Sequence, residues 1–364
     1  MSSLNETYLE NRKITHNLLQ TVHNLGEYQG RYASYEKLTP HLLEKLREIA
    51  RTESVKASNR LEGITTPLPR FNALMSKGIN PANRSEQEIV GYRDVLAMIH
   101  TNYEHIPVTP NYILQLHRDL YASTSDSSGG EWKRTDNEIV ATQTDGTRYV
   151  RFRPTPAWQT PDAMRVLCDN YRRLTEARSI DTLLLIPAFV LDFLCIHPFA
   201  DGNGRMSRLL TLLLLYKSGY MVGAYISLER NIEAQKIGYY ETLEIASQDW
   251  HSGKHSDQRW TDYFLSVMLL SAYREFDERV KMVNTTARGG KAQNVKDAIQ
   301  QLSLRFRFED VERVCVGVSV PLLRKVLAEM RHEGKLIVGR GANAYYLKTE
   351  AYLQSIHVPD ERMP

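Results

Sequence analysis

Hydrophobic residues recur at helical spacing along most of this chain, and the pattern predicts a mainly helical protein. The two most apolar segments, 181–196 and 206–217, are hydrophobic on nearly all sides, which is typical of helices in the centre of a core. The loop between them is polar. Further helices are expected within 1–40, at the periphery, and at 40–62, 85–99, 110–120, 162–176, 232–247 and 260–283.

Two helix boundaries carry recognisable signals. Ser85 with Glu88 three residues later resembles a capping box, in which each side chain binds a free backbone amide at a helix start. Gly63, which precedes a proline-bearing loop, is expected to end the helix at 40–62.

Residues 137–153 have a different pattern. β-branched and aromatic residues stand on both sides of Asp145-Gly146, which is a strong signal for a β-hairpin. A single hairpin is marginally stable by itself, so this one should lie against the helices or accept a partner strand.

The last part of the chain predicts a separate domain at 285–350, after a flexible cationic joint at 287–293. Helices are expected at 294–302, 308–314 and 320–332, followed by a hairpin that turns at Arg340-Gly341. Three helices and a two-stranded wing are typical of a winged helix-turn-helix. The helix at 320–332 would be the recognition helix, and it carries Arg324, Lys325 and Arg331.

The distribution of charge supports a separate domain at 285–350. The overall composition does not point to a class of partner. The net charge of the whole chain is only +3, but residues 285–348 contain 12 Lys and Arg against 6 Asp and Glu. The remaining domains are expected at 1–84 and 85–283. Three widely separated cysteines are expected to be reduced, and without an apolar N-terminal stretch or a long apolar helix we expect a cytoplasmic protein with no membrane segment.

The polar loop between the two apolar helices has the residues of a phosphate site. Gly202, Asn203 and Gly204 can form a turn whose amides point at an anion where the next helix starts. Arg205 and Arg208 are three residues apart, so they should project from one side of that helix toward a di- or triphosphate.

The same loop offers a metal ligand and a base. Asp201 is a candidate Mg²⁺ ligand, since Mg²⁺ takes one or two carboxylates and shares its shell with substrate phosphates. His197 could accept a proton from an incoming hydroxyl group. Pro198 is expected to keep His197 extended and Phe199 to anchor the loop in the core.

The stretch from His197 to Arg208, HPFADGNGRMSR, is similar to the signature of the Fic family, HPFx[D/E]GN[G/K]RxxR. The resemblance extends over about residues 85–270. It implies an all-α Fic fold with a β-hairpin flap, and transfer of AMP from Mg-ATP to a hydroxyl side chain of a protein, which could be the chain itself.

The resemblance also implies a role for each residue of the signature. His197 would be the base, and Asp201 would hold Mg²⁺. Asn203 and the amides of the glycine turn would hold the α-phosphate, while Arg205 and Arg208 would reach the β- and γ-phosphates.

Further site residues follow from the same resemblance. The hairpin at 137–153 would be the flap that holds the target segment as an added strand, with Ile139 and Val140 facing it. Tyr239 and Tyr240 resemble an aromatic pair that lines the adenine pocket, although two tyrosines on a helix are as often core residues.

Residues 58–63, SNRLEG, look like the inhibitory motif [S/T]xxxE[G/N] of Fic proteins that silence themselves. A carboxylate from Glu62 could form a bidentate ion pair with Arg208 and occupy the place of the γ-phosphate. The alternative is a glutamate exposed to water at a helix end.

Three other interpretations stay open. The same site could remove AMP, with Glu62 orienting a water molecule, or could use another phosphodiester donor. The chain could instead be a transcriptional regulator that binds DNA through residues 285–350 and senses nucleotide at the Fic site. That last domain could also dock a protein, and a homodimer is a further expectation.

Overall fold

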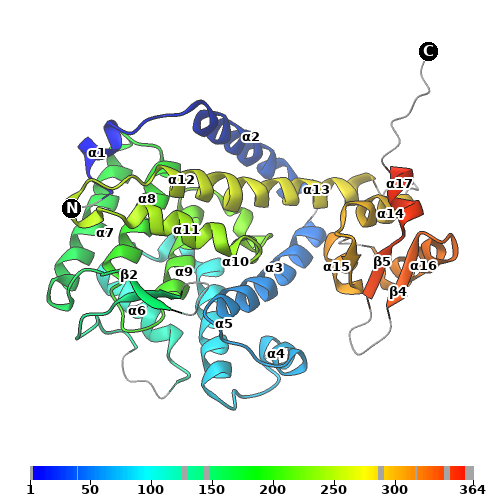
Figure 1. Ribbon diagram of the computed structural model, residues 1–364, viewed down its shortest axis with the longest axis horizontal. Coiled ribbons are helices and arrows are strands. Elements are labelled where there is room, and N and C mark those ends of the chain that lie inside the picture. Colours follow the sequence, from blue (N-terminus) through cyan, green and yellow to red (C-terminus); the bar gives the residue numbers. More distant parts are fainter. Residues whose placement is uncertain are drawn as a thin grey trace. The chain divides into compact units, whose positions relative to one another are not determined.

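The structure is a computed structural model, and it describes residues 3–38, 40–124, 129–142, 147–285, 291–315, 318–339 and 345–356. It is mainly helical, as the hydrophobic pattern predicts (Figure 1). The chain divides into two compact units, one of Met1–Tyr32 with Ala50–Tyr273 and one of Ala33–Ile49 with Arg274–Pro364.

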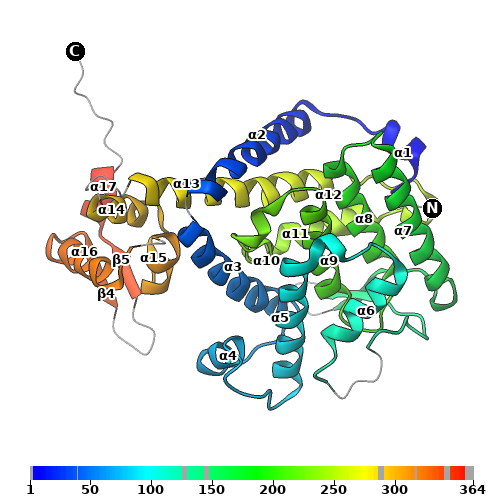
Figure 2. The same ribbon diagram turned by 180° about the vertical axis from the view of Figure 1, so that it is seen from behind.

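The first unit is built around the two apolar helices. These are α8 (Thr182–Ile196) and α9 (Asn203–Lys217), which pack against each other and are buried along nearly their whole length. α7 (Thr160–Ala177) and α11 (Lys236–Ser247) cover α8, and α5 (Arg84–Asn102) covers α9 (Figure 2). The polar loop therefore joins two helices of the core.

The other helices that contribute to this unit are short or lie toward its outside. They are α1 (Glu6–Glu10), α2 (His16–Leu38), α3 (Pro40–Leu61), α4 (Leu68–Met75), α6 (Pro110–Leu120), α10 (Leu228–Ala234), α12 (Gln258–Asp262), the π-helix η5 (Tyr263–Leu270) and α13 (Ser271–Thr285). Short 3₁₀ turns are η1 (Tyr103–His105), η2 (Ala157–Gln159), η3 (Met221–Ala224) and η4 (Trp250–Ser252).

Several expected boundaries are wrong. The peripheral helix within 1–40 is interrupted and forms α1 and α2, the helix at 232–247 is divided into α10 and α11, and the proline-bearing loop contains α4. The capping box at Ser85 is also wrong, because Asn83 caps α5 by accepting a hydrogen bond from the amide of Glu86 at 3.0 Å. By contrast, α3 ends at Leu61 and Gly63 has a φ of 76°, as expected of a glycine that stops a helix.

The expected hairpin is present. β1 (Ile139–Thr142) pairs antiparallel with β2 (Arg148–Phe152), with an irregularity between Ile139 and Val140. Its turn at Asp145-Gly146 lies outside the described residues. β2 packs on α11, and Phe152 stacks on His251 with ring centroids 5.4 Å apart, so the helical unit supports the hairpin.

The second unit has its own hydrophobic core. Besides the end of α2, the start of α3 and most of α13, it contains α14 (Lys291–Gln301), β3 (Arg305–Phe306), α15 (Phe308–Val314), α16 (Val320–His332), β4 (Leu336–Gly339), β5 (Tyr345–Lys348) and α17 (Glu350–Ile356). The three expected helices and the two hairpin strands are there, and β3 makes a third strand in the order β3-β5-β4. The turn at Arg340-Gly341 and most of the joint at 287–293 lie outside the described residues.

Within the described ranges, no helix combines the length and the apolar character that crossing a membrane requires.

Candidate active site

The loop between α8 and α9 has a specific backbone shape. His197 ends α8 with φ 51° and ψ 61°, so it is left-handed and not extended as Pro198 led us to expect. Its amide still donates to Phe193 O at 2.9 Å, which explains the difference, because His197 closes the last turn of the helix. Gly202, with φ 82°, is the left-handed residue immediately before α9 begins, a conformation that glycine adopts without strain.

Phe199 anchors this loop, as expected. It is fully buried, and its ring stacks on His117 with centroids 3.7 Å apart and planes nearly parallel. His117 Nδ1 accepts from Gly130 N at 3.0 Å, so its Nε2 carries the proton and donates to Asp201 O at 3.1 Å. A buried histidine of α6 therefore holds the loop on either side of Ala200.

Asn203 also fixes the shape of the turn. Its side-chain oxygen accepts from Phe199 N at 3.0 Å, and its side-chain nitrogen donates to Phe199 O at 2.8 Å. Both ends of the amide thus bind the loop backbone, while the residue lines the cavity.

Lys133 supports the loop from a segment that the sequence did not single out. Its amide donates to Pro198 O at 2.8 Å, and its buried Nζ donates to Ile196 O at 3.1 Å and to Asn137 Oδ1 at 2.8 Å. Desolvation of this ammonium group lowers the pKa of Lys133 to about 8. No local pattern marks this lysine, because its contacts with the loop are to Ile196 and Pro198, more than sixty positions away.

The loop forms one wall of a cavity of about 240 Å³. The residues predicted from the sequence that line it are Glu62, Ile139, His197, Asp201, Gly202, Asn203, Gly204, Arg208, Tyr239 and Tyr240. The remaining lining residues, which were not predicted as site residues, are Arg151, Phe152, Leu191, Leu194, Cys195, Ala200, Leu243 and Ser247. Segments far apart in the sequence thus meet at one hollow.

His197 is arranged to accept a proton in this cavity. Its Nδ1 lies 3.3 Å from Leu194 O, and a carbonyl oxygen only accepts, so Nδ1 carries the proton and Nε2 keeps its lone pair. Desolvation, helped by the charges of Lys133 and Arg151, lowers the pKa of His197 from 6.5 to about 4. The ring is therefore neutral near pH 7.

Glu62 reaches into the cavity from the end of α3 and binds Arg208. Arg208 Nη2 lies 2.7 Å from Glu62 Oε1, while its Nε and Nη2 also donate to Ser58. The pair is not bidentate as expected: one contact, from Nη2, joins the two side chains, and Ser58 binds the edge of the guanidinium formed by Nε and Nη2. The arginine side chain is 3% exposed and the glutamate side chain 32% exposed, so the contact faces the hollow.

The Glu62 carboxylate also covers the glycine turn. A Cβ atom placed on Gly204 would overlap with Glu62 Oε1, so the carboxylate lies directly against the first turn of α9. An anion that used both this turn and Arg208 would have to displace it.

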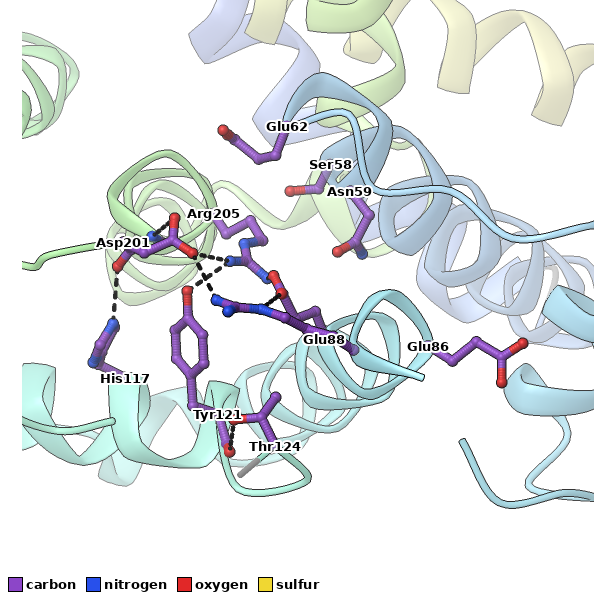
Figure 3. A network of polar contacts seen from close by, with 12 residues as sticks. Ser58, Asn59, Glu62, Glu86, Glu88, His117, Tyr121, Thr124, Asp201 and Arg205 are labelled. Atoms are coloured by element: carbon purple, nitrogen blue, oxygen red, sulfur yellow. Dashed lines mark hydrogen bonds and ion pairs between the residues drawn. The ribbon is translucent and has the colours of Figure 1, made fainter. Parts of the chain in front are cut away.

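Arg205 does not project into the cavity with Arg208, which corrects the expectation for it. Its side chain is 1% exposed, and its Nη1 lies 2.6 Å from a carboxylate oxygen of Glu88 on α5. Its Nη2 donates to Tyr121 Oη at 2.8 Å (Figure 3). The charge of Arg205 is used to hold α5, α6 and α9 together beneath the loop.

Asp201 has the chemistry of a ligand for Mg²⁺. Its side chain is 59% exposed; Oδ1 accepts from Gly202 N at 2.7 Å, and Oδ2 is 3.5 Å from Arg84 Nη2. In the part of the chain that the structure describes, no cluster of three or more His, Cys, Asp or Glu forms a cage for a metal ion. A single exposed carboxylate fits Mg²⁺ that is shared with substrate phosphates.

The hairpin contributes to the cavity from both strands. Ile139 of β1 and the consecutive residues Arg151 and Phe152 of β2 line it. Val140 does not line it and is 42% exposed, and the strand pairing is irregular between Ile139 and Val140.

The tyrosine pair lines the cavity, and Tyr239 is also part of the core. Tyr239 and Tyr240 meet edge to face with centroids 5.2 Å apart, and Tyr239 packs in the same way on Trp260. Ser247, on the same helix, completes this wall.

Comparison with known proteins agrees with the signature. Residues 107–215 match the model of the Fic/DOC family. The protein adenylyltransferase Fic of Drosophila erecta is 26% identical over 213 residues, which are 57% of this chain and 39% of that protein. That of Drosophila yakuba is 25% identical over 260 residues, which are 68% of this chain and 48% of that protein. The chain thus spans less than half the length of these curated relatives.

Solved structures share the fold. A Fic family protein from Desulfovibrio desulfuricans G20 superposes with a TM-score of 0.59 at 22% identity, covering 93% of this chain and 98% of that one. A Fic domain containing signaling protein from Bacteroides thetaiotaomicron VPI-5482 gives a TM-score of 0.60 at 22% identity, covering 71% of this chain and 97% of that one. The mainly helical fold is confirmed, and it is similar to that of these Fic-fold structures.

Proposed function

We propose that this chain is a protein adenylyltransferase, which transfers AMP from Mg-ATP to a Tyr, Ser or Thr hydroxyl of a target protein. The observation that carries the proposal is that His197, with a free Nε2 lone pair, lines the same cavity as the glycine turn and Arg208. The names of the curated relatives agree with this reaction class.

The reaction needs few groups. The target hydroxyl oxygen bonds to the α-phosphorus, the bond from that phosphorus to the bridging oxygen of the β-phosphate breaks, and pyrophosphate leaves. The hydroxyl proton passes to His197 Nε2. The turn at 202–204 and Arg208 would bind the phosphates, so catalysis consists mostly of positioning and charge stabilisation.

Asp201 would hold Mg²⁺, which supplies neutralisation of phosphate charge when it is bound. The hairpin would hold the target segment by main-chain pairing beside the cavity, which would bring the hydroxyl near His197 with little demand on the target sequence.

Glu62 would keep the enzyme inactive. Its carboxylate binds Arg208 and covers Gly204, so it lies where an anion on these groups would lie. ATP would then compete with Glu62 for Arg208, and the outcome of this competition would decide whether the enzyme is active.

Labelling with ATP radioactive at the α-phosphate tests both parts of the proposal. We expect Glu62→Gly to raise self-labelling or labelling of a lysate, and His197→Ala in that background to abolish it. Glu44→Ala, at an exposed position of α3, is the matched control and should behave as the natural chain. Unchanged labelling in Glu62→Gly would refute the inhibitory role, and persisting labelling without His197 would refute the base.

AMP removal, or use of another phosphodiester donor, would employ the same cavity. Mass spectrometry of the target after incubation with ATP separates these reactions. A gain of AMP supports transfer, whereas loss of AMP from a modified target supports removal.

DNA binding by the second unit is a second candidate function. Arg324, Lys325 and Arg331 of α16 are all exposed, which leaves their charges available to phosphates. A gel shift with duplex DNA at several salt concentrations tests it, since binding through phosphates weakens steeply with salt. Protein docking by this unit predicts no shift.

A further inference from the structure

Arg151 brings a positive charge into the cavity from the hairpin. It lies on β2 and lines the cavity, whereas Arg148 on the same strand and Arg153 just beyond it are exposed. Arg153 also pairs with Glu138, with 3.1 Å between Nε and Oε1. Of these three arginines, Arg151 is thus the one that faces the reaction space.

The charge of Arg151 has no partner among the described residues. Its Nε is buried without a hydrogen bond, and no described carboxylate lies within 4.0 Å of the guanidinium. The two acids of the cavity are engaged elsewhere, Glu62 with Arg208 and Asp201 with Gly202 N. A half-buried cation without a counter-ion is costly, so the site is suited to receive an anion at this point.

The position of Arg151 identifies which anion this would be. Its side chain lines the same cavity of about 240 Å³ as His197, and it reaches that cavity from β2, whereas Glu62 reaches it from the end of α3. For transfer, the hydroxyl must come within hydrogen-bond reach of His197, with the phosphorus roughly 3–3.5 Å beyond it. A cation that enters this small cavity from the hairpin is therefore suited to meet the reacting phosphoryl group.

We propose that Arg151 is a catalytic residue that binds a non-bridging oxygen of the ATP α-phosphate and stabilises its negative charge while the target oxygen attacks. This inference rests on the proposed adenylyltransfer. Because Arg151 belongs to the strand pair that would hold the target, the same hairpin would orient both reactants.

The test uses the full chain with Glu62→Gly, so that the cavity is open. In this background we compare Arg151→Met, Arg151→Lys and Arg172→Met, the last being an exposed arginine of α7, outside the hairpin and the cavity. We expect Arg151→Met to lower kcat roughly a hundredfold, as the loss of one preorganised donor does, with a much smaller change in KM for ATP. Arg151→Lys should recover part of the rate, and Arg172→Met should be unaffected.

A stereochemical measurement separates contact with the phosphate from a structural effect. The two diastereomers of ATP with sulfur on the α-phosphorus place sulfur at one or the other non-bridging oxygen. We expect the Glu62→Gly enzyme to prefer one diastereomer, and Arg151→Met to reduce that preference several-fold. A general folding defect would slow both diastereomers equally, and an unchanged preference would overturn the inference.

The remaining outcomes are distinct. Failure of the Glu62→Gly enzyme to label anything would refute the proposed function itself. Full activity of Arg151→Met beside an active Glu62→Gly enzyme would overturn only the role of Arg151. A rise in KM for the target protein, with kcat unchanged, would overturn it as well, since Arg151 would then bind an acidic group of the target.

Discussion

Arg208 binds Ser58 through two of its nitrogens: Nε donates to Ser58 Oγ at 2.8 Å, and Nη2 donates to Ser58 O at 3.0 Å. Ser58 is fully buried and lies one helical turn before Glu62. The serine and the glutamate of the proposed inhibitory motif therefore bind the same guanidinium, and Ser58 keeps it within reach of Glu62.

Ser58→Ala should activate the enzyme partially. Loss of one hydrogen bond to Arg208 weakens its attachment to α3 by about 1 kcal/mol, which corresponds to roughly fivefold in the inhibited population. Self-labelling should rise, but less than in Glu62→Gly. The control is Ser54→Ala, one turn earlier on α3, whose hydroxyl donates to Ser227 and not to Arg208. Equal labelling in the two alanine variants would contradict this role of Ser58.

Gly204→Ala should also weaken inhibition. The new Cβ would overlap with Glu62 Oε1, which is the end of a flexible side chain and can move away. The Fic signature accepts lysine at this position, so a side chain there is compatible with the fold. We expect labelling between that of the natural chain and that of Glu62→Gly. Gly30→Ala, where a Cβ meets nothing within 4 Å, is the control, and labelling no higher than in Gly30→Ala would refute the steric argument.

Glu88→Ala should destabilise the protein strongly. It leaves the buried charge of Arg205 without its main partner, and breaking such a pair costs about 3–5 kcal/mol. Denaturant unfolding should show this loss. Glu6→Ala breaks the exposed pair with Arg173 and should cost less than about 1 kcal/mol. A similar, small effect of both variants would mean that Arg205 does not depend on Glu88.

The acid limb of the pH profile of kcat/KM, where activity falls as the base is protonated, should lie at unusually low pH. Because desolvation lowers the pKa of His197 to about 4, the base is neutral across pH 5–7, and kcat/KM of the Glu62→Gly enzyme should stay flat there instead of falling below pH 6.5. Between about pH 4 and 6.5 the folded state binds fewer protons at His197 than the unfolded state does. This group therefore makes the protein less stable as pH falls, so folding must be checked at each pH.

Lys133→Met tests how the charge of Lys133 contributes to this low acid limb. Removal of this cation should raise the pKa of His197 and move the acid limb upward. Arg134→Met changes an exposed neighbour that pairs with Glu131, and it should leave the limb in place. A limb near pH 6.5 in the Glu62→Gly enzyme would contradict the desolvation of His197.

Much of the site could be predicted from the sequence because it is local. The segment from His197 to Arg208 contains the loop, the glycine turn and the helix start, and the apolar segments on both sides placed it in the core. The segment at 58–63, which we propose to be inhibitory, and the hairpin at 137–153 were also found from short patterns, and the structure brings Glu62 and Ile139 to the same cavity.

Direction and pairing of side chains depended on tertiary structure. The sequence placed Arg205 and Arg208 on one side of a helix, but Glu88 on α5 binds the first and Ser58 on α3 binds the second. Helical spacing fixes the direction in which two side chains leave the backbone. The polar groups that pack around them determine which partners they bind.

The sequence alone determined that a helical protein has a polar, glycine-containing loop between two buried helices, because hydrophobic periodicity and turn chemistry act over a few residues. Only the tertiary structure decided that Lys133 supports His197, that Asn203 holds Phe199, and that Arg151 faces the cavity. These roles come from contacts across the fold. Desolvation and hydrogen-bond satisfaction are set by whatever packs nearby, and no spacing along the chain encodes them.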